Sequence, residues 1–489
     1  MQRLHPNHLD LLAPGVLRPH YDRSTMQTGI VHLGLGAFHR AHQALYTDSV
    51  MNLTGDTRWG IAGVSLRSAD VGQHLQPQGL LYSVFERHGE DTQARVVGAL
   101  TQAWHAPTQR ELVMQALADP RVKVVTLTVT EKAYGLHPSS GLLDESHPDV
   151  AADLKTPHLP CSVLGWLCAA LARRPANAPL NVLCCDNMNR NGDVLKGGLV
   201  EFARRTAPHL VGRIEDQWAL PNTMVDRIVP AATPQSLAWA SEALGLRDES
   251  ALVCEPFRQW VIEDRFITDR PRWEEAGVLL VDAVAPYQDM KLRLLNAAHS
   301  AIAYVGQCMG LSTVAEVMAH PVCSAYIRSL MLDDLLKVTP VPAGYDARRY
   351  VLDLLHRFEN AALAHRTEQI AMDGTQKVAV RWLPGLRAGL QQGQSLPRLM
   401  SALAVWLHYL DRGCSASGQA LHIQDPGAAA LQARLHAAEG LHHKVLAACQ
   451  HEAVFGPNDW PREWALEVTQ HWSLLEGQGL AALMGSVSR

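Results

Sequence analysis

The residues best suited to chemistry are Lys291, Asn296 and His299, which lie in the apolar stretch 290–300. Apolar residues recur there at helical spacing without a breaker, so the pattern predicts a helix that starts at Met290. At ~100° per residue, Lys291 and His299 lie ~80° apart in projection, and Asn296 lies one turn before His299. The three side chains can therefore point into one cleft.

A lysine in such a cleft can act as a general base. A partly desolvated ammonium group loses its proton more readily than a solvated one, so it can work near neutral pH. The alternative is a helix that carries three ordinary polar residues. From spacing alone that alternative is favoured, because structural charges are common.

A second candidate site is the Gly-x-Gly motif at 34–36. It follows the apolar run 29–34, which predicts a buried strand, and precedes a predicted helix over 38–51. This arrangement is typical of a dinucleotide-binding turn, in which glycines let the backbone approach a pyrophosphate. His39 stands where the usual third glycine would be, so a plain strand–turn–helix is the alternative. The cofactor candidates at this turn are Gly34, Gly36, Ala37 and Phe38.

The predicted strand 59–64 is followed by Arg67 and Asp70. An acidic residue after the second strand normally accepts hydrogen bonds from the adenosine ribose hydroxyls, so Asp70 is a cofactor candidate and favours NAD. Arg67 could instead approach the 2′-phosphate of NADP, or be a solvated surface charge.

Two further predicted strands, 122–129 and 180–185, lead to Thr130 and Asn187. Ligands in open α/β sheets lie beyond the carboxyl ends of strands, which makes Thr130 a cofactor candidate.

Bulk properties narrow the class of protein. The 489 residues are 47% hydrophobic and 19% charged, which fits two or three globular domains. The net charge of −5 and the absence of a long basic run argue against nucleic acid or an anionic membrane as a partner. Residues 1–16 do not resemble a signal peptide, and no apolar run is long enough to span a bilayer. We expect a cytoplasmic protein, as a monomer or a small homo-oligomer.

Cysteine and histidine spacing argues against a metal site. The nine cysteines show no framework spacing, which predicts free buried thiols in a reducing compartment. The chain has 24 histidines but no His-x-x-x-His or Cys-x-x-Cys pair. The sequence therefore predicts chemistry that does not use a metal ion.

The Lys-x-x-x-x-Asn-x-x-His motif resembles the catalytic signature of the polyol-specific long-chain dehydrogenases. This family includes mannitol 2-dehydrogenase and fructuronate reductase (mannonate oxidoreductase). Five other stretches resemble the family in the same order and extend the resemblance over most of the chain: 34–43, 130–132, 185–187, 224–228 and 260–264.

The resemblance implies an α/β fold with an expanded Rossmann domain, residues 1–286, followed by a mostly α-helical substrate and catalytic domain, residues 287–489. The apolar strand 278–281 and the break at Pro286 place that boundary, and residues after Asp289 have helical patterns. The site would lie in the cleft between the domains. Such a fold would bind NAD and transfer hydride between a secondary alcohol and the nicotinamide.

The resemblance also implies roles for residues. Lys291 would take the hydroxyl proton, and His299 would position the hydroxyl. Asn296 and Asn187 would stabilise the oxyanion. For Asn187 the alternative is a turn residue with satisfied local bonds. Asp226 matches a site residue of the family, with a structural ion pair near Arg227 as the alternative.

The stretch 365–377, predicted as a loop, resembles fructuronate reductases more than mannitol dehydrogenases, which have an arginine where Gln369 stands. Arg366 and Lys377 could meet a substrate carboxylate, because a guanidinium matches its two oxygens. The alternative is that Arg366 pairs with Glu368 or Asp373. D-mannonate with D-fructuronate is the favoured substrate pair. A neutral polyol such as mannitol or arabinitol is the second choice, and a non-catalytic nucleotide-binding regulator is a remote third.

Overall fold

The computed structural model describes residues 1–137, 141–457 and 460–488. The chain divides into two compact units, Met1–Ala285 and Pro286–Arg489. We call them unit 1 and unit 2 and describe each by itself.

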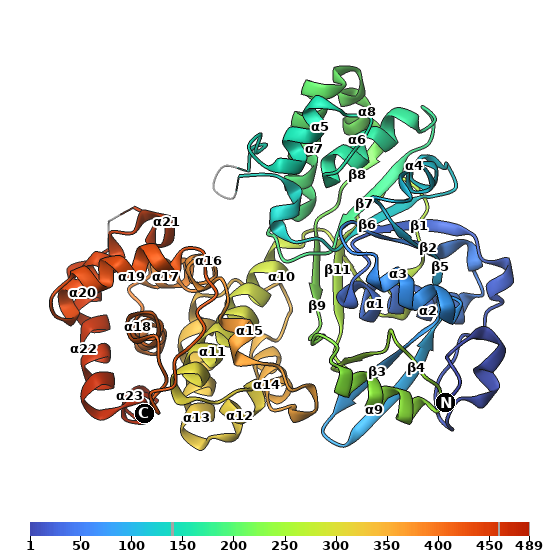
Figure 1. The fold of residues 1–489 in the computed structure, drawn as a ribbon. Helices are drawn as coiled ribbons and strands as arrows, with labels where there is room; N and C mark the ends of the chain where they lie inside the picture. The colour runs from blue at the N-terminus through green and yellow to red at the C-terminus, as the bar shows by residue number, and fades with distance from the viewer. Residues whose placement is uncertain (138–140, 458–459, 489) are drawn as a thin grey trace. The chain divides into compact units, whose positions relative to one another are not determined.

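Unit 1 is built on a six-stranded parallel sheet in the order β5-β2-β1-β6-β7-β8 (Figure 1). Numbered along the chain, this is the order 3-2-1-4-5-6 of the dinucleotide-binding fold, so the predicted Rossmann domain is confirmed. The strands are β1 (Thr28–Leu33), β2 (Gly60–Ser65), β5 (Leu100–His105), β6 (Val124–Leu127), β7 (Leu180–Cys184) and β8 (Trp218–Ala219).

Both faces of this sheet are covered, which explains why its central strands are buried and mostly apolar. Val31 and Leu33 of β1 pack with helices α4, α6 and α7, while Ile30 packs with α2 on the other face. The helices of unit 1 are α1 (Ala37–Ala41), α2 (Gln43–Thr54), α3 (Asp70–Leu75), α4 (Arg110–Ala118), α5 (Pro148–Lys155), α6 (Val163–Arg173), α7 (Asn191–Thr206), α8 (Val211–Gln217) and α9 (Pro234–Leu244).

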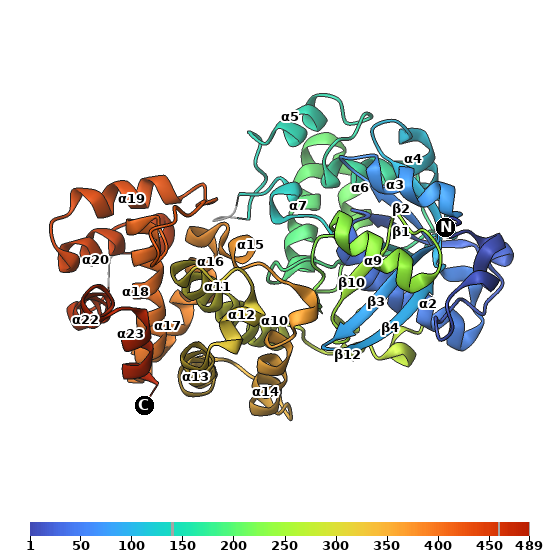
Figure 2. The same cartoon turned by 60° about the horizontal axis from the view of Figure 1, so that its bottom comes forward.

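Two three-stranded sheets complete unit 1. One has the order β10-β3-β4, and α9 packs on it through Ala240 and Leu244 (Figure 2). The other has the order β12-β11-β9. Their strands are β3 (Tyr82–His88), β4 (Asp91–Val97), β9 (Thr223–Asp226), β10 (Leu252–Cys254), β11 (Gln259–Glu263) and β12 (Leu279–Val281).

The predicted single helix over 38–51 is wrong, because the structure forms two helices that meet at His42. This residue has φ −128° and ψ −88°, outside the helical region. Its ring nitrogen Nε2 lies 2.9 Å from the carbonyl oxygen of Gln259 in β11. A tertiary contact of this kind cannot be read from local spacing.

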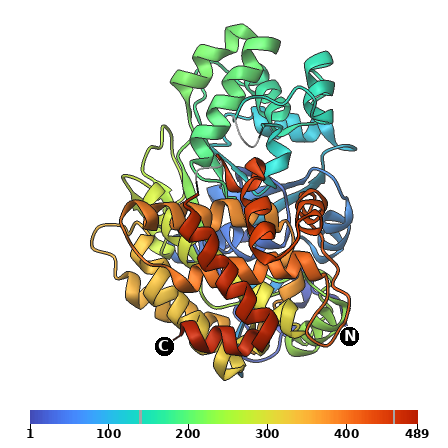
Figure 3. The same cartoon turned by 90° about the vertical axis from the view of Figure 1, so that its left-hand side faces the viewer.

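Unit 2 is helical, as the sequence predicts (Figure 3). Its core is one large apolar cluster. None of the helices in the described part of the chain is long and apolar enough to cross a membrane. The helices are α10 (Ala285–Met290), α11 (Ala297–Met309), α12 (Val314–Ala319), α13 (Pro321–Ser329), α14 (Ala347–Phe358), α15 (Thr367–Ala371), α16 (Gly374–Arg381), α17 (Leu383–Gln391), α18 (Pro397–Arg412), α19 (Ala428–Ala437), α20 (Leu441–Cys449), α21 (Glu452–Phe455), α22 (Arg462–Gln478) and α23 (Leu480–Val487).

The predicted helix start at Met290 is also wrong, because α10 already begins at Ala285. Pro286 occupies the first turn of α10 and is the first residue of unit 2. A proline is tolerated there because its missing N–H has no partner within the helix in any case.

Candidate functional site

The turn after β1 contains two of the predicted cofactor residues, Gly34 and Gly36. Gly34 has φ +102°, and a Cβ there would lie 2.4 Å from the carbonyl oxygen of Thr128. Both the backbone conformation and the space exclude a side chain at this position. Gly36 has an extended conformation and precedes α1. The turn lies where the strand order reverses, the usual ligand-binding place in open α/β sheets.

The start of α1 carries Ala37 and Phe38, whose side chains stay partly exposed. The next residue, His39, is buried and stacks on His32 with 3.3 Å between the ring centroids. Burial lowers the pKa of His32 to about 3 and that of His39 well below its ordinary value. The helix–strand contact that a third glycine usually allows is thus made here by two neutral rings.

Asp70 and Arg67 follow β2 on the exposed surface. The carboxylate of Asp70, at the start of α3, makes no hydrogen bond or ion pair with another described residue. Arg67 pairs with Asp149 at 2.6 Å, and 73% of its side chain is exposed. The pairing agrees with Arg67 as a surface charge and leaves the Asp70 carboxylate able to accept hydrogen bonds.

Thr130 and Asn187 follow the neighbouring strands β6 and β7, and both are exposed. The turn around Asn187 is held by Asp186, whose carboxylate accepts from the Met188 amide at 3.0 Å. The same oxygen accepts from Asn191 Nδ2 at 3.2 Å. The predicted oxyanion donor is therefore placed on a turn with a fixed backbone.

Asp226 is the last residue of β9 and is only 3% exposed. From the sequence alone, the alternative role of Asp226 is a structural ion pair near Arg227. Arg227 does form an ion pair, but its partner is Glu86 and not Asp226. The Arg227 guanidinium also donates to the carbonyl oxygen of Ala41 at 2.6 Å. The charge of Asp226 acts on the ring of His42, whose pKa burial lowers to about 3.

In unit 2, Lys291 begins a π-helical segment, Lys291–Asn296, between α10 and α11. In an α-helix, Lys291 and Asn296 would lie ~140° apart, because each residue turns the helix by ~100°. The i→i+5 bonding of a π-helix puts more residues in each turn and so brings residues five apart closer to one side. Lys291 is buried with 9% exposure, and Asn296 is partly exposed. Short π segments are frequent at functional sites.

Arg381, the last residue of α16, and Trp382, which follows it, support the end of this π segment. Arg381 Nη1 donates to the carbonyl oxygen of Asn296 and to Ser300 Oγ, both at 3.0 Å. Trp382 Nε1 donates to the carbonyl oxygen of Ala297, also at 3.0 Å. Irregular helical carbonyls are thus satisfied by side chains from a second helix.

His299 lies in a buried and positively charged environment. Burial lowers its pKa well below the ordinary value, and the neighbouring His365 and the charges of Arg381, Arg357 and Lys291 lower it further. Its ring packs edge-to-face on His365, with 5.4 Å between centroids. His299 Nε2 is buried and has no hydrogen-bond partner among the described residues. His299 is therefore a neutral ring that can hydrogen-bond a ligand.

The predicted loop over 365–377 is wrong, because this stretch forms α15 and the start of α16. The reason is a tertiary contact with the end of α11. Thr367 is fully buried, and its hydroxyl donates to the carbonyl oxygen of Leu311 at 2.8 Å. Between the two helices, Met372 and Asp373 form a turn outside helical geometry, and Asp373 has φ +55°.

The two residues predicted to bind a substrate carboxylate differ in their surroundings. Lys377 acts on His365, which packs on His299, whereas Arg366 forms an ion pair with Glu368. The charge of Lys377 helps burial to lower the pKa of His365 to about 4. Lys377 Nζ also donates to the carbonyl oxygen of Ile370 at 3.0 Å. Arg366 pairs with Glu368 at 2.9 Å, as in the structural alternative, and its side chain is 65% exposed.

Three residues of this environment were not singled out from the sequence: His365, Arg357 and Arg381. Arg357 carried a usable signal, because it falls among the apolar positions of α14 and is only 7% exposed. A charged residue on a buried helix face needs a partner or a function. His365 and Arg381 carried no such local signal.

The cysteines agree with the sequence in part. All nine cysteines are free, and seven are buried, but Cys161 is exposed and Cys414 is half-buried. Within residues 1–137, 141–457 and 460–488, no group of three or more His, Cys, Asp or Glu side chains is arranged to hold a metal ion.

Known proteins show the same two-part organisation. Residues 28–275 match the mannitol dehydrogenase Rossmann domain, and residues 283–472 match the mannitol dehydrogenase C-terminal domain. D-mannonate oxidoreductase of Escherichia coli (strain K12) is 41% identical over 423 residues, which cover 85% of this chain and 87% of that protein. Mannitol 2-dehydrogenase of Phaeosphaeria nodorum is 39% identical over 423 residues, with 85% and 74% covered.

A solved structure agrees over nearly the full length. The ternary complex of Pseudomonas fluorescens mannitol 2-dehydrogenase with NAD and D-mannitol has a TM-score of 0.89 and 33% identity to this chain, with 99% of both chains covered. The chain therefore belongs to the mannitol dehydrogenase family of oxidoreductases.

Proposed function

We propose that this protein is an NAD-dependent oxidoreductase that interconverts D-mannonate and its ketone, D-fructuronate. The observation that carries this choice is the charge around His299. After burial, the strongest effects on its ring come from His365 and from the cations Arg381, Arg357 and Lys291. A substrate carboxylate would be stabilised in such a field, whereas a neutral polyol would gain less. The identity to D-mannonate oxidoreductase supports the same choice.

The residues of unit 1 fit the proposed cofactor. Gly34 leaves the backbone bare at the point where the strand order reverses, and a Cβ there would collide with Thr128. Asp70 offers a carboxylate with no partner among the described residues, as ribose hydroxyls require. NAD is present in the Pseudomonas fluorescens complex. When bound, its nicotinamide would accept hydride from the alcohol carbon or return it to the ketone.

The proposed roles of the chain's own residues follow from their chemistry. Lys291 takes the hydroxyl proton during oxidation and returns it during reduction. Asn296 and Asn187 donate hydrogen bonds to the oxygen as negative charge develops on it. His299 is neutral, so its ring can accept a hydrogen bond from a substrate hydroxyl, which an imidazolium cannot do.

The test of the proposed function is a substrate panel with NADH and with NAD. Fructuronate should be reduced with a higher kcat/KM than fructose, and mannonate oxidised with a higher kcat/KM than mannitol or arabinitol. Better turnover of the neutral compounds would assign the protein to the polyol branch, as in the mannitol 2-dehydrogenases. No turnover of any compound, with NADH still bound, would indicate a nucleotide-binding regulator.

We predict that NADH is preferred over NADPH and that Asp70→Ala weakens this preference. The Asp70 carboxylate repels a 2′-phosphate and accepts from the free hydroxyls, so its loss should cost ~1.5–3 kcal/mol of NADH efficiency. The measurement is kcat/KM for both cofactors in the parent and the variant. Arg67→Ala is the control and should leave the ratio unchanged. NADPH preference in the parent protein, lost in Arg67→Ala, would move the assignment to Arg67.

We predict that Lys377→Ala loses ~1.5–3 kcal/mol of efficiency on fructuronate, the value of a charged hydrogen bond, and much less on fructose. Arg366→Ala is the matched control, because Arg366 is largely exposed and paired with Glu368. It should change both substrates little. Equal losses on fructuronate and fructose in Lys377→Ala would show that this lysine does not contact the carboxylate.

A further inference from the structure

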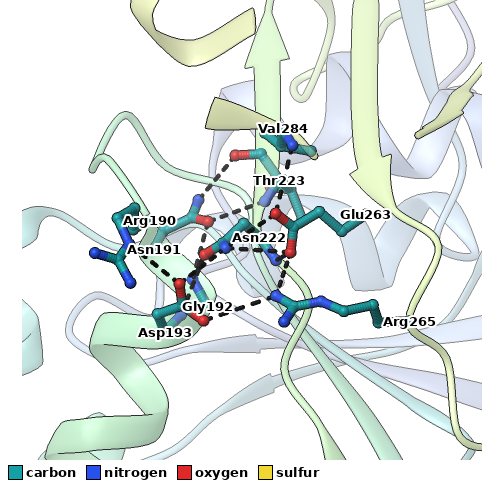
Figure 4. A network of polar contacts seen from close by, with 9 residues as sticks. All are labelled: Arg190, Asn191, Gly192, Asp193, Asn222, Thr223, Glu263, Arg265 and Val284. Atoms are coloured by element: carbon teal, nitrogen blue, oxygen red, sulfur yellow. Dashed lines mark hydrogen bonds and ion pairs between the residues drawn. The ribbon is translucent and has the colours of Figure 1, made fainter. Parts of the chain in front are cut away.

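We propose that Asn191 and Asn222 are positioning residues for the turn that carries Asn187, and that Glu263 holds Asn222 in place. The inference rests on the oxyanion role proposed above for Asn187. The three residues belong to one hydrogen-bond network that joins the start of α7, the connection between β8 and β9, and the end of β11 (Figure 4).

Asn222 caps α7 from a distant part of the chain. The residue before the helix, Arg190, has φ +53°, and its side chain gives no cap. Instead, Asn222 Oδ1 accepts from the Gly192 amide at 3.0 Å and from the Asp193 amide at 3.1 Å. First-turn amides have no partner within their helix, so Asn222 takes the place of the missing local cap. The position of the helix start, directly after the turn of Asn187, therefore depends on Asn222.

Asn191 connects the end of β7, just before that turn, to the start of β9. Its Nδ2 donates to the carbonyl oxygen of Cys184, the last residue of β7, at 2.9 Å, and to Asp186 Oδ1 at 3.2 Å. Toward β9, Nδ2 donates to the carbonyl oxygen of Thr223 at 3.2 Å and Oδ1 accepts from its amide at 3.0 Å. Asn191 is fully buried, so these bonds are shielded from water. They fix the backbone immediately before Asn187.

Glu263 is the buried charge that orients Asn222. Its carboxylate accepts from Asn222 Nδ2, 3.2 Å from both oxygens, and from the Asn222 amide at 3.2 Å. The same carboxylate pairs with Arg265 and accepts from the Val284 amide at 3.4 Å. A buried carboxylate is tolerated only with such partners. Because Nδ2 must face Glu263, Oδ1 must face the amides of α7.

The fit at the start of α7 is too tight for a side chain. A Cβ at Gly192 would lie 2.4 Å from the carbonyl oxygen of Leu220 and 2.6 Å from that of Pro221. The connection between β8 and β9 thus approaches the helix backbone directly, and this approach brings Asn222 within reach of the amides. A small displacement of a catalytic donor can cost ~100-fold in rate, so a rigid support for Asn187 has a functional value.

The test compares Asn222→Ala with Asn181→Ala. Asn181 is an equally buried asparagine at the other end of β7, where Nδ2 donates to the Thr268 carbonyl oxygen at 3.1 Å and Oδ1 accepts from the Ile267 amide at 3.0 Å. We expect Asn222→Ala to lower kcat ~10–100-fold with the Kd of NADH unchanged. Asn181→Ala should lose stability without a comparable loss in kcat.

A second readout does not depend on the substrate. Hydrogen exchange of a peptide over residues 186–193 should become faster in Asn222→Ala, because the Asp193 amide loses its acceptor and the Gly192 amide keeps only Asn191 Oδ1. The same peptide should be unchanged in Asn181→Ala. If the parent protein turns over no sugar acid or polyol, the proposed function fails, and the exchange experiment alone decides on the network.

A paired exchange provides the rescue. Asn222→Asp alone should lower kcat, because two carboxylates then face each other. In the double variant with Glu263→Gln, the amide nitrogen at position 263 can donate to the carboxylate at position 222. This restores the hydrogen bond with donor and acceptor exchanged, and should recover most of kcat. If Asn222→Ala does not fold, Glu263→Gln tests the same contact without a change in volume. Unchanged exchange over 186–193, equal kcat losses in the two alanine variants, or no recovery in the double variant would overturn the proposal.

Discussion

Lys291→Ala should lower kcat ~10²–10⁴-fold, the usual contribution of a positioned acid or base. Lys291 is buried at the first residue of the π-helical segment, so water is poorly placed to replace it as a proton acceptor. The affinity for NADH should be unchanged, because the proposed cofactor residues all belong to unit 1. Single-turnover kinetics of NADH oxidation measures the chemical step, and fluorescence titration measures cofactor binding.

Lys337→Ala is the matched control for this experiment. Lys337 is an exposed lysine in the same unit, in a short helical turn, and its removal leaves the same net charge as Lys291→Ala. It should keep parental kinetics. Near-normal turnover in Lys291→Ala would remove the lysine from the mechanism, and a parallel loss of NADH affinity would point to a structural role.

The Rossmann sheet could be predicted because its signal is local. β1, β6 and β7 are short apolar runs, and each ends at polar or glycine residues. Parallel strands covered on both faces are mostly apolar, so composition marks them even though His32 and Asn181 interrupt two of the runs. The Gly34 turn could be predicted for a similar reason, since a positive φ favours glycine and the residue type therefore indicates the backbone conformation.

The details of the unit 2 site could not be predicted, because they depend on contacts between distant segments. The π-helical segment at Lys291 keeps the apolar spacing of an α-helix, and Arg381 and Trp382 support it from another helix. The helical conformation of the stretch around Thr367 likewise depends on its burial against α11. The sequence predicts Lys291 and His299 on one helix, and the structure places them in the π-helical segment and in α11. Nothing in the local sequence indicates that His365 packs on His299.

Buried histidines should make the protein sensitive to mild acid. Burial lowers the pKa of His32 and His42 to about 3, that of His365 to about 4, and those of His39 and His299 well below the ordinary value. In the unfolded chain each would titrate near 6.5. The unfolded state therefore binds more protons than the folded state below that pH, and the free energy of unfolding must fall as pH falls.

The size of this effect follows from the shift. The stabilisation is fully present above pH ~6.5. Between pH 7 and pH 5, each buried histidine lowers the free energy of unfolding by ~2 kcal/mol. Since domains are stable by only ~5–15 kcal/mol, a few such groups account for much of the total. The buried carboxyls of Asp48 and Asp248 have raised pKa values and act in the opposite direction. A comparison of variants that share these carboxyls cancels their contribution.

We expect that comparing the pH dependence of unfolding in the parent and in His365→Asn measures the contribution of His365 alone. Urea unfolding at pH 7 and pH 5 should show that the free energy of unfolding falls by ~2 kcal/mol less in His365→Asn than in the parent, since the variant lacks one proton-binding group in the unfolded state. His443→Asn, at an exposed position on α20, is the control and should follow the parent. Parallel pH profiles for the parent and His365→Asn would mean that His365 is protonated alike in the folded and unfolded states, and would contradict its assignment as a neutral ring beside His299.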